Sequence, residues 1–481
     1  MKRLALALLL LECVVVTAQQ TPVLPKPAEA PYFTDAFPTE EFAARRAAVM
    51  KQIGDAVAIV QGAPEMSAEV AFRQNNQFFY LTGVEVPRAI VVIDGKARKS
   101  TLFLGPPRRE RYNGPELGPG DEAARITGLD AVVERDSFAA MVTQFGQDGR
   151  IVYTPFRAEV RGGGSGGEAT AHAKATASDP WDGRPPRELA FQQKLQASAT
   201  TISIKDLDPI IDAMRFIKSA REIAMMREVA RITGEGIMEA MREAAPGRFE
   251  YELTAVSEWA FRRYNSQGPG YFPLSATGAN TVYTHYHRGL RKLQDGDIVQ
   301  FDYAPDYKYY TSDISRVFPA NGKFTARQRE FYEVYLSLYQ ALMTSIKPGI
   351  TITQVANDAG AKMGGILAGF KFTDPKIKEA ATKFAAVYQS GKPRSGLGHG
   401  LGMEVHDVTI RRDSFQPGEL FTIEPAIEIP DESLAMRIED VILITETGFE
   451  NLSAFVPIEI ADIEKLMREP GLSDLRAKSP R

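Results

Sequence analysis

The sequence predicts an α/β protein of the α+β type, built from two domains. Its length of 481 residues exceeds what one ordinary hydrophobic core accommodates, so two domains are expected. The first half alternates short apolar runs with helical stretches, and the second half contains two apolar hairpins. With 44% hydrophobic and 25% charged residues, the composition is that of an ordinary globular protein.

The N-terminus is typical of a secretory signal peptide, which we place at residues 1–18. Lys2 and Arg3 precede an apolar run that ends at the small residues Thr17 and Ala18. The run is too short to cross a bilayer as a transmembrane helix. We therefore expect a secreted or periplasmic protein with no membrane attachment once the signal is removed.

Charge and cysteine content exclude several classes of function. The net charge is −4 and the sequence has no basic cluster or arginine-rich arm, which argues against nucleic acid as a partner. The only cysteine, Cys13, lies in the predicted signal. A chain processed after residue 18 has no thiol, so disulfides, cysteine catalysis and thiolate metal ligands are excluded together.

The first domain is expected over residues 36–205, after a proline-rich extended linker at 19–35. Short apolar runs predict its strands, at residues 57–60, 78–83, 89–94 and 100–105. Residues 161–186 are rich in Gly, Ala, Thr and Ser, which predicts a mobile low-complexity insert on the surface.

The rest of the chain divides into a second domain and a C-terminal tail, at residues 206–470 and 471–481. Two capping boxes predict the starts of two helices: Ser219 with Glu222, and Thr325 with Gln328. Residues at helical spacing after each box are assigned to the core: Ile223, Met226, Ala230, Thr233 and Ile237, then Tyr332, Tyr335, Tyr339 and Leu342.

The first predicted hairpin carries a pair of carboxylates. Its segment, VQFDYAPDYKYYTSDISRVF, is rich in Val, Ile, Phe and Tyr, which predicts two strands joined by a turn near Pro305 and Asp306. In a regular hairpin centred on that turn, Asp302 and Asp313 face one another about 5 Å apart.

The second predicted hairpin repeats the arrangement with Glu424 and Glu439, on either side of a turn at residues 430–432. Asp440 should point to the opposite face of its strand. Facing like charges repel, so two such pairs indicate a cation between them, and divalent metal is the obvious candidate. The chain has 61 acidic residues, and solvated surface charge explains any single pair as well. The occurrence of the same carboxylate pair in both hairpins favours a metal site over solvated surface charge.

Histidine supplies a fifth candidate ligand. His399 stands in GLGHGLG, where glycines allow close backbone approach, and neutral imidazole is a common metal ligand. Four carboxylates and one imidazole suit Mn²⁺, while Co²⁺, Zn²⁺ and Fe²⁺ also fit by affinity. Two divalent ions balance four carboxylates, so we favour a two-metal site. His172 and His287 are assigned to the surface.

Several ordered motifs make the chain resemble a known family. In the second half these are MRFIKSAREIAMMREVARIT, ATGANTVYTHYH, GLGHGLGMEVHD, FTIEPAIEIP and RIEDVILITETGFENLS, together with the first hairpin. They resemble the Xaa-Pro aminopeptidases (aminopeptidase P), dinuclear-metal peptidases with the pita-bread fold that are closely related to prolidases. In the first half, FRQNNQFFYLTGVEVPRA is similar to the family's N-terminal creatinase-like domain. The resemblance is weakest over 161–186.

The resemblance implies roles for individual residues. Its metal ligands fall on Asp302, Asp313, His399, Glu424 and Glu439, the set that the hairpins and the glycine-framed histidine indicate. Asp313 and Glu439 would bridge two ions. Asp302 would serve one ion, and His399 with Glu424 would serve the other.

The resemblance also implies a reaction. A metal-bridging hydroxide would attack the carbonyl carbon of the first residue in a peptide that begins Xaa-Pro. Glu424 would act as general base, and His406 would stabilise the oxyanion. His285 would orient the scissile bond and, with Tyr286, line a compact slot for the proline ring.

Three departures from the family pattern leave the ligand set unchanged. Ser395 stands where relatives often have a further histidine, Glu428 replaces a common tyrosine, and Ala304 replaces a frequent glycine. They bear on pocket shape and on the preferred substrate length.

Other functions share these motifs and stay open. A prolidase would accept only Xaa-Pro dipeptides, and a catalytically inactive pita-bread module would bind partners without cleaving them. Inactive relatives, and the metal-free hydrolase creatinase, lack ligands that are all present here. Family members are usually dimers or tetramers, so we expect a homo-oligomer.

Overall fold

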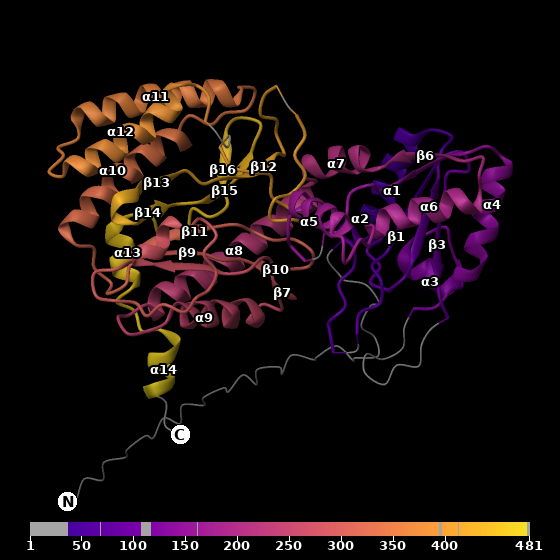
Figure 1. Ribbon diagram of the computed structural model, residues 1–481, viewed down its shortest axis with the longest axis horizontal. Helices are drawn as coiled ribbons and strands as arrows, with labels where there is room; N and C mark the ends of the chain where they lie inside the picture. The colour runs from indigo at the N-terminus through magenta and orange to yellow at the C-terminus, as the bar shows by residue number, and fades with distance from the viewer. Residues whose placement is uncertain are drawn as a thin grey trace, which may run out of the picture.

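The computed structural model shows two domains connected by helix α7 (Asp208–Phe216), as Figure 1 shows. It describes residues 37–67, 69–106, 117–160, 162–393, 397–411 and 413–478. The predicted signal peptide and linker, at residues 1–18 and 19–35, lie outside these ranges. Within the ranges, no helix combines the length and the apolar character needed to cross a membrane.

The N-terminal domain contains one mixed six-stranded sheet in the order β4-β3-β2-β1-β5-β6. Its strands are β1 (Val57–Gln61), β2 (Ile90–Asp94), β3 (Lys99–Leu104), β4 (Ala131–Glu134), β5 (Ile151–Thr154) and β6 (Ser203–Asp206). Val57 and Ile59 pack into one hydrophobic cluster, and Ala58 and Val60 into another, because successive strand residues point to opposite faces. Both faces of the sheet are therefore covered.

The helices of this domain are α1 (Thr39–Ile53), α2 (Asn76–Thr82), α3 (Asp121–Thr127), α4 (Phe138–Gln147), α5 (Gly166–Ser178) and α6 (Arg187–Ser198). Three of the four predicted strands are confirmed as β1, β2 and β3. The fourth, at 78–83, is wrong, because this run forms most of α2. Asn75 caps the helix by accepting from the backbone N–H of Phe78 at 3.1 Å, and every residue of α2 is buried. An apolar run buried on all sides has no periodicity that distinguishes strand from helix.

The segment predicted as a low-complexity surface insert, at residues 161–186, contains regular structure. It contains α5, whose first turn is capped by the Ser165 hydroxyl, which accepts from the backbone N–H of Glu168 at 3.2 Å. Just before the helix, the carbonyl of Gly163 accepts a 2.6 Å hydrogen bond from the backbone N–H of Val405, in the C-terminal domain. The segment therefore connects the two domains.

The C-terminal domain contains helices α8 (Ala220–Glu243), α9 (Glu250–Arg263), α10 (Ala326–Met343), α11 (Ile352–Gly369), α12 (Pro375–Gln389), α13 (Ile460–Leu466) and α14 (Leu472–Lys478). Both predicted capping boxes are confirmed: Ser219 with Glu222 opens α8, and Thr325 with Gln328 opens α10. The tyrosines of α10 are buried, as predicted.

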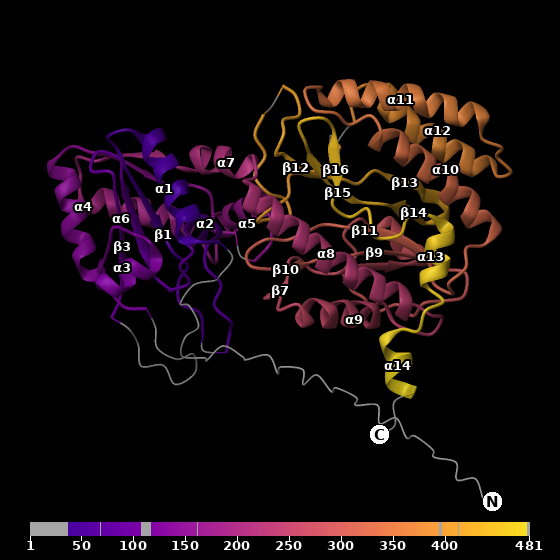
Figure 2. The same ribbon diagram turned by 180° about the vertical axis from the view of Figure 1, so that it is seen from behind.

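Two three-stranded sheets, β11-β9-β8 and β12-β15-β16, lie between these helices. The strands are β7 (Gly268–Pro269), β8 (Leu274–Thr277), β9 (Ile298–Asp302), β10 (Pro305–Asp306), β11 (Ser315–Pro319), β12 (Leu420–Ile423), β13 (Ala426–Ile429), β14 (Leu434–Arg437), β15 (Asp440–Ile444) and β16 (Phe449–Asn451). Helices α8 and α9 lie on one side, and α10, α11 and α12 on the other (Figures 1 and 2). This is the pita-bread arrangement that the family resemblance implied.

The second hairpin has the predicted register. Ile423 pairs with Asp440 and Ala426 with Arg437, which places Glu424 opposite Glu439 between the two ladders. Asp440 bonds to Arg316 and Tyr339, on the face away from Glu439, as predicted.

The register predicted for the first hairpin is wrong by two residues. Asp302 pairs with Ser315 rather than with Asp313, because the turn lies at Lys308 and Tyr309 instead of Pro305 and Asp306. The side-chain period of a strand is two, so this shift keeps Asp313 on the predicted face.

Candidate active site

Three of the predicted ligands converge directly. Ligand atoms of Asp313, His399 and Glu439 all lie within 4.8 Å of one another, a grouping suited to a metal ion. His399 Nε2 lies 3.5 Å from Asp313 Oδ2 and 3.2 Å from Oε1 of Glu424, the fourth predicted ligand. The hairpins and the glycine-framed histidine, far apart in sequence, thus meet at one point.

Asp302, the fifth predicted ligand, joins the cluster through Tyr271. The Tyr271 hydroxyl lies 2.6 Å from Asp302 Oδ1 and 2.9 Å from Asp313 Oδ1. The other oxygen of Asp302 pairs with the guanidinium of Arg437, which is buried at the end of β14. The Ser315 hydroxyl donates to Glu439 Oε2 at 2.8 Å. These neighbours orient the carboxylates and neutralise one charge.

One positive charge leaves the cluster strongly acidic. Burial, together with the charges of Asp302 and Glu424, raises the pKa of Asp313 well above its usual range. Burial and the charge of Asp313 do the same to the pKa of Glu439. Glu439 Oε1 is buried without a hydrogen-bond partner among the described residues. Hard oxygen donors, one imidazole and an unpaired buried oxygen fit divalent cations of the Mn²⁺ or Zn²⁺ kind.

The loop that supplies the imidazole needs glycine at one position. A Cβ on Gly398 would lie 2.0 Å from the carbonyl oxygen of Thr422, so only glycine allows the loop to lie against β12. His399 then exchanges hydrogen bonds with Thr422, and its Nδ1 lies 3.1 Å from the Gly400 carbonyl. That contact places the proton on Nδ1 and leaves Nε2 free to face the carboxylates.

The other predicted site residues surround the cluster. The His406 ring centroid lies 4.1 Å from that of His399. Burial, with smaller contributions from His399 and His285, lowers the pKa of His406 to about 4, so its ring is neutral near pH 7. His285 is exposed, with its ring centroid 6.4 Å from that of Phe272. Tyr286 donates to Glu250 at 3.0 Å, a contact that anchors the loop carrying His285. The contact predicted between Tyr286 and the proline ring of the substrate stays a prediction.

The three departures from the family pattern lie in different settings. Glu428 is exposed on β13 and alternates with buried Ile427 and Ile429. Ala304 is fully buried beside β10. Ser395 lies outside the described residues.

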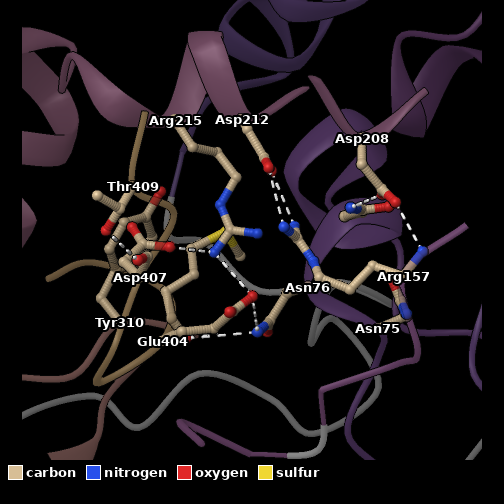
Figure 3. A network of polar contacts seen from close by, with 12 residues as sticks. Asn75, Asn76, Arg157, Asp208, Asp212, Arg215, Tyr310, Glu404, Asp407 and Thr409 are labelled. Atoms are coloured by element: carbon tan, nitrogen blue, oxygen red, sulfur yellow. Dashed lines mark hydrogen bonds and ion pairs between the residues drawn. The ribbon is translucent and has the colours of Figure 1, made fainter. Parts of the chain in front are cut away.

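The irregular segment at residues 397–411, which we call the histidine loop, is held by buried ion pairs (Figure 3). Arg215, at the end of α7, bonds to Glu404 at 2.9 Å and to Asp407, and Lys218 reaches Asp407 at 3.3 Å. Burial opposes the charge on Asp407, but Arg215 and Lys218 outweigh it and hold the pKa of this carboxyl below its usual value. Asp407 directly follows His406, so these pairs fix the position of that ring.

The N-terminal domain extends this network. The amide of Asn76, in α2, donates to Glu404 at 3.4 Å. Arg157 forms a paired contact with Asp212 of α7 at 2.8 and 2.9 Å. Residues from both domains and from α7 therefore hold the histidine loop in place.

Sequence reasoning missed Tyr271 and Arg437. Neither lies in a predicted hairpin turn, and each reads as an ordinary core or strand residue. An available signal was the position of Arg437 two residues before Glu439, on the same face of the extended chain.

Replacing Tyr271 by Phe is expected to lower manganese affinity by about tenfold, within the range for partners that orient metal ligands. The ring stays, but Asp302 and Asp313 lose a shared donor. Calorimetric titration with manganese checks this, with Tyr303→Phe as control, since the Tyr303 hydroxyl bonds to Glu258 instead. An unchanged affinity in Tyr271→Phe would show that the phenol does not orient the ligands.

Comparisons with known proteins agree with this geometry. Metallopeptidase family M24 matches residues 224–446, and the aminopeptidase P N-terminal domain matches residues 42–153. The Xaa-Pro aminopeptidase of Escherichia coli is 32% identical over 456 residues, covering 89% of this chain and 97% of the relative. That of Haemophilus influenzae is 31% identical over 459 residues, with the same coverage of both chains.

Solved structures of aminopeptidase P are also similar to this chain. Escherichia coli aminopeptidase P with the inhibitor Pro-Leu superposes with a TM-score of 0.70 at 29% identity, covering 90% of this chain and 98% of that chain. The zinc-substituted Escherichia coli enzyme in complex with product has a TM-score of 0.69 at 29% identity, covering 92% and 100%.

Proposed function

Because the chain belongs to the Xaa-Pro aminopeptidase family of M24 metallopeptidases, we propose that it removes the first residue from peptides with proline in second position. The observation that carries the proposal is the convergence of Asp313, His399 and Glu439, with Asp302 and Glu424 beside them. Relatives of nearly the same length are named for this activity, which supports the substrate class.

The five predicted ligands would hold two divalent ions. As the family resemblance implies, Asp313 and Glu439 would be ligands of both ions, and the ligand atoms of these two residues and of His399 lie within 4.8 Å of one another. Asp302 would complete one site, and His399 with Glu424 the other. Such ions lower the pKa of a coordinated water and polarise a scissile carbonyl.

Glu424 is suited to take a proton from the attacking water. Its side chain is 26% exposed, against 4% for Asp302, 7% for Asp313 and 1% for Glu439. A carboxylate at the edge of the cluster can bind substrate-side protons and release them to solvent. Thr422 donates to its Oε1 at 3.3 Å and holds it in place.

Two further histidines, His285 and His406, contact the peptide. His406 is neutral near pH 7 and can donate one hydrogen bond to the oxygen that becomes negative during attack. His285 lies on the exposed side of the site, where it orients the scissile bond and the proline that leaves.

Binding of the peptide's N-terminus at the site would explain cleavage at the first bond. A free α-amine would bind near the metal ions and the carboxylate cluster, which places the first peptide bond next to Glu424 and His406. A bond to proline has no N–H, so the site needs no acceptor for that group and relies on a slot that fits the ring.

Cleavage of a peptide series tests the substrate class. With manganese supplied, Ala-Pro-Ala should be cleaved after alanine more than about tenfold faster than Ala-Ala-Ala, because loss of the ring removes apolar contact in the slot. The released residues are quantified by chromatography.

Adding the dipeptide Ala-Pro to the series tests the alternative functions. Cleavage confined to the dipeptide Ala-Pro would indicate a prolidase. A folded protein that cleaves none of these peptides and binds no manganese would indicate an inactive binding module, and either outcome would contradict the proposal.

Three further points belong to the proposal. The physiological metal is Mn²⁺, supported by the oxygen-rich ligand set; elemental analysis of protein purified without added metal tests it. The protein is a dimer or tetramer, as usual in the family, which light scattering tests. The protein is secreted or periplasmic after cleavage of the signal peptide near residue 18. N-terminal sequencing of the exported protein tests this.

A further inference from the structure

The turn of the first hairpin adopts a backbone conformation that its residues disfavour. Lys308 has a φ of 50° and Tyr309 a φ of 73°, and the backbone groups of Tyr307 and Tyr310 exchange hydrogen bonds of 2.8 and 3.0 Å around them. Positive φ at both central residues is the type I′ geometry that Asn-Gly supplies at low cost. A bulky residue in this region is strained and persists only where its surroundings hold it.

The surroundings of Tyr309 come from the N-terminal domain. Its ring stacks on Phe79 of α2, with centroids 3.6 Å apart and planes 6° from parallel. Its hydroxyl donates to Glu85 at 2.7 Å and accepts from the backbone N–H of Gln74 at 2.9 Å. The Arg73 guanidinium lies 4.5 Å from the ring centroid. The side chain is 1% exposed.

The same tip carries a second link to this domain. Arg73 forms an ion pair with Asp306, three residues before Tyr309. Arg73 is in turn bonded to the Asn76 side chain at 2.7 Å. The tip of a hairpin from the C-terminal domain is therefore embedded in the N-terminal domain, around α2.

This anchor bears on the metal ligands because the hairpin arms separate below the turn. The arm that leads from Asp302 pairs through β10 with β7. The other arm bonds to the histidine loop, where Thr311 N–H donates to the Gly402 carbonyl at 2.9 Å. Asp313 lies between Thr311 and the first residue of β11. Its position therefore depends on the tip above it as well as on the ladder below it.

We propose that Tyr309 is a positioning residue, through which the N-terminal domain sets the place of Asp313 between the proposed metal ions. The contacts that hold the strained turn also hold the arm that carries this ligand. Loss of the ring releases that arm without removing any ligand. The inference rests on the metal site of the proposed function, but its main readout is metal affinity rather than peptide cleavage.

Tyr309→Gly is the decisive variant, because glycine adopts a φ of 73° without strain and keeps the turn while removing the anchor. Titration of metal-stripped protein with manganese chloride should show a dissociation constant raised by about tenfold, the lower end for partners that orient ligands. Turnover of Ala-Pro-Ala should fall to a similar extent, with KM changed less than twofold. Tyr309→Phe keeps the stacking and should restore most of the affinity.

Two controls separate positioning from general loss of stability. Tyr332→Ala removes a tyrosine of equal burial from α10, whose hydroxyl bonds to the Ile458 carbonyl at 2.7 Å. Lys308→Gly relieves the backbone strain at position 308 but keeps the Tyr309 ring. Both should bind manganese within twofold of wild type. If Tyr309→Gly does not fold, Phe79→Leu weakens the same stack from the N-terminal domain and should raise the dissociation constant by a smaller factor.

The proposal is overturned if Tyr309→Gly binds manganese as wild type does, or if Tyr332→Ala shows the same loss. A wild-type protein that binds manganese but cleaves no Xaa-Pro peptide would contradict the proposed function alone. The comparison of dissociation constants would then still decide the role of Tyr309.

Discussion

Replacing Asp313 by Asn is expected to lower cleavage of Ala-Pro-Ala by more than about a hundredfold, even with manganese in excess. Partners that only orient metal ligands already contribute about 10- to 100-fold to affinity or activity, so loss of a proposed metal ligand should reach at least the upper end. The substitution keeps the shape of the side chain but removes a charge from the centre of the cluster. Metal content by elemental analysis should fall together with turnover.

His399→Ala should give the same result from the other side of the cluster, since it removes the imidazole 3.5 Å from Asp313. The matched control is Asp431→Asn, on the second hairpin but at an exposed position paired with Lys376. It should keep wild-type turnover and metal content. Wild-type turnover in Asp313→Asn or His399→Ala would remove the proposed site altogether.

Replacing Arg215 by Met is expected to destabilise the protein by about 3–5 kcal/mol, the usual cost of removing one partner from a buried ion pair. Arg215 is 1% exposed, and its loss leaves Glu404 without its cation and Asp407 with Lys218 alone. Urea denaturation followed by circular dichroism measures the change. Turnover in stable conditions should also fall, because Asp407 adjoins His406.

Two comparisons make the Arg215 result specific. Arg227→Met breaks an ion pair with Glu450 that is largely exposed, and should cost less than about 1 kcal/mol. Adding Glu404→Gln to Arg215→Met removes the one charge left without its ion-pair partner, since Asp407 keeps Lys218, and should recover much of the stability. A loss in Arg215→Met no larger than in Arg227→Met would mean that the pairs do not hold the loop.

The second hairpin and the helix starts could be predicted because their signals are local. The register that places Glu424 opposite Glu439 follows from apolar alternation on both sides of a turn containing Pro430. The boxes at Ser219 and Thr325 are also closed by partners three residues away. Neither needs information from elsewhere in the chain.

The first hairpin shows where local reasoning failed. Pro305 and Asp306 have the chemistry of a turn, whereas Lys308 and Tyr309 do not, yet the latter form it. Contacts of Tyr309 with Phe79 and Glu85 outweigh the preference of the backbone. Those contacts join residues more than two hundred positions apart, so no window of sequence contains them.

The predictions for helix α2 and for the residues around the proposed ligands failed for a related reason. The run at 78–83 is apolar on every side because it lies between both domains, which removes the periodicity that identifies a helix. Tyr271 and Arg437 take their roles from the carboxylates that they meet in space. The sequence around Tyr271 gives no sign of its role, and for Arg437 the one local signal is its position two residues before Glu439.

The amino-acid order by itself determined which groups can bind metal: oxygen donors on two apolar hairpins and an imidazole framed by glycine. Chemistry of that kind is a property of residue type and short-range periodicity, which folding does not alter. Tertiary structure alone decided how the charges are balanced and held, through Arg437, Tyr271 and the contacts that embed Tyr309 in the N-terminal domain. Coulombic attraction and close packing depend on distance in space, and the fold sets that distance between segments far apart in the chain.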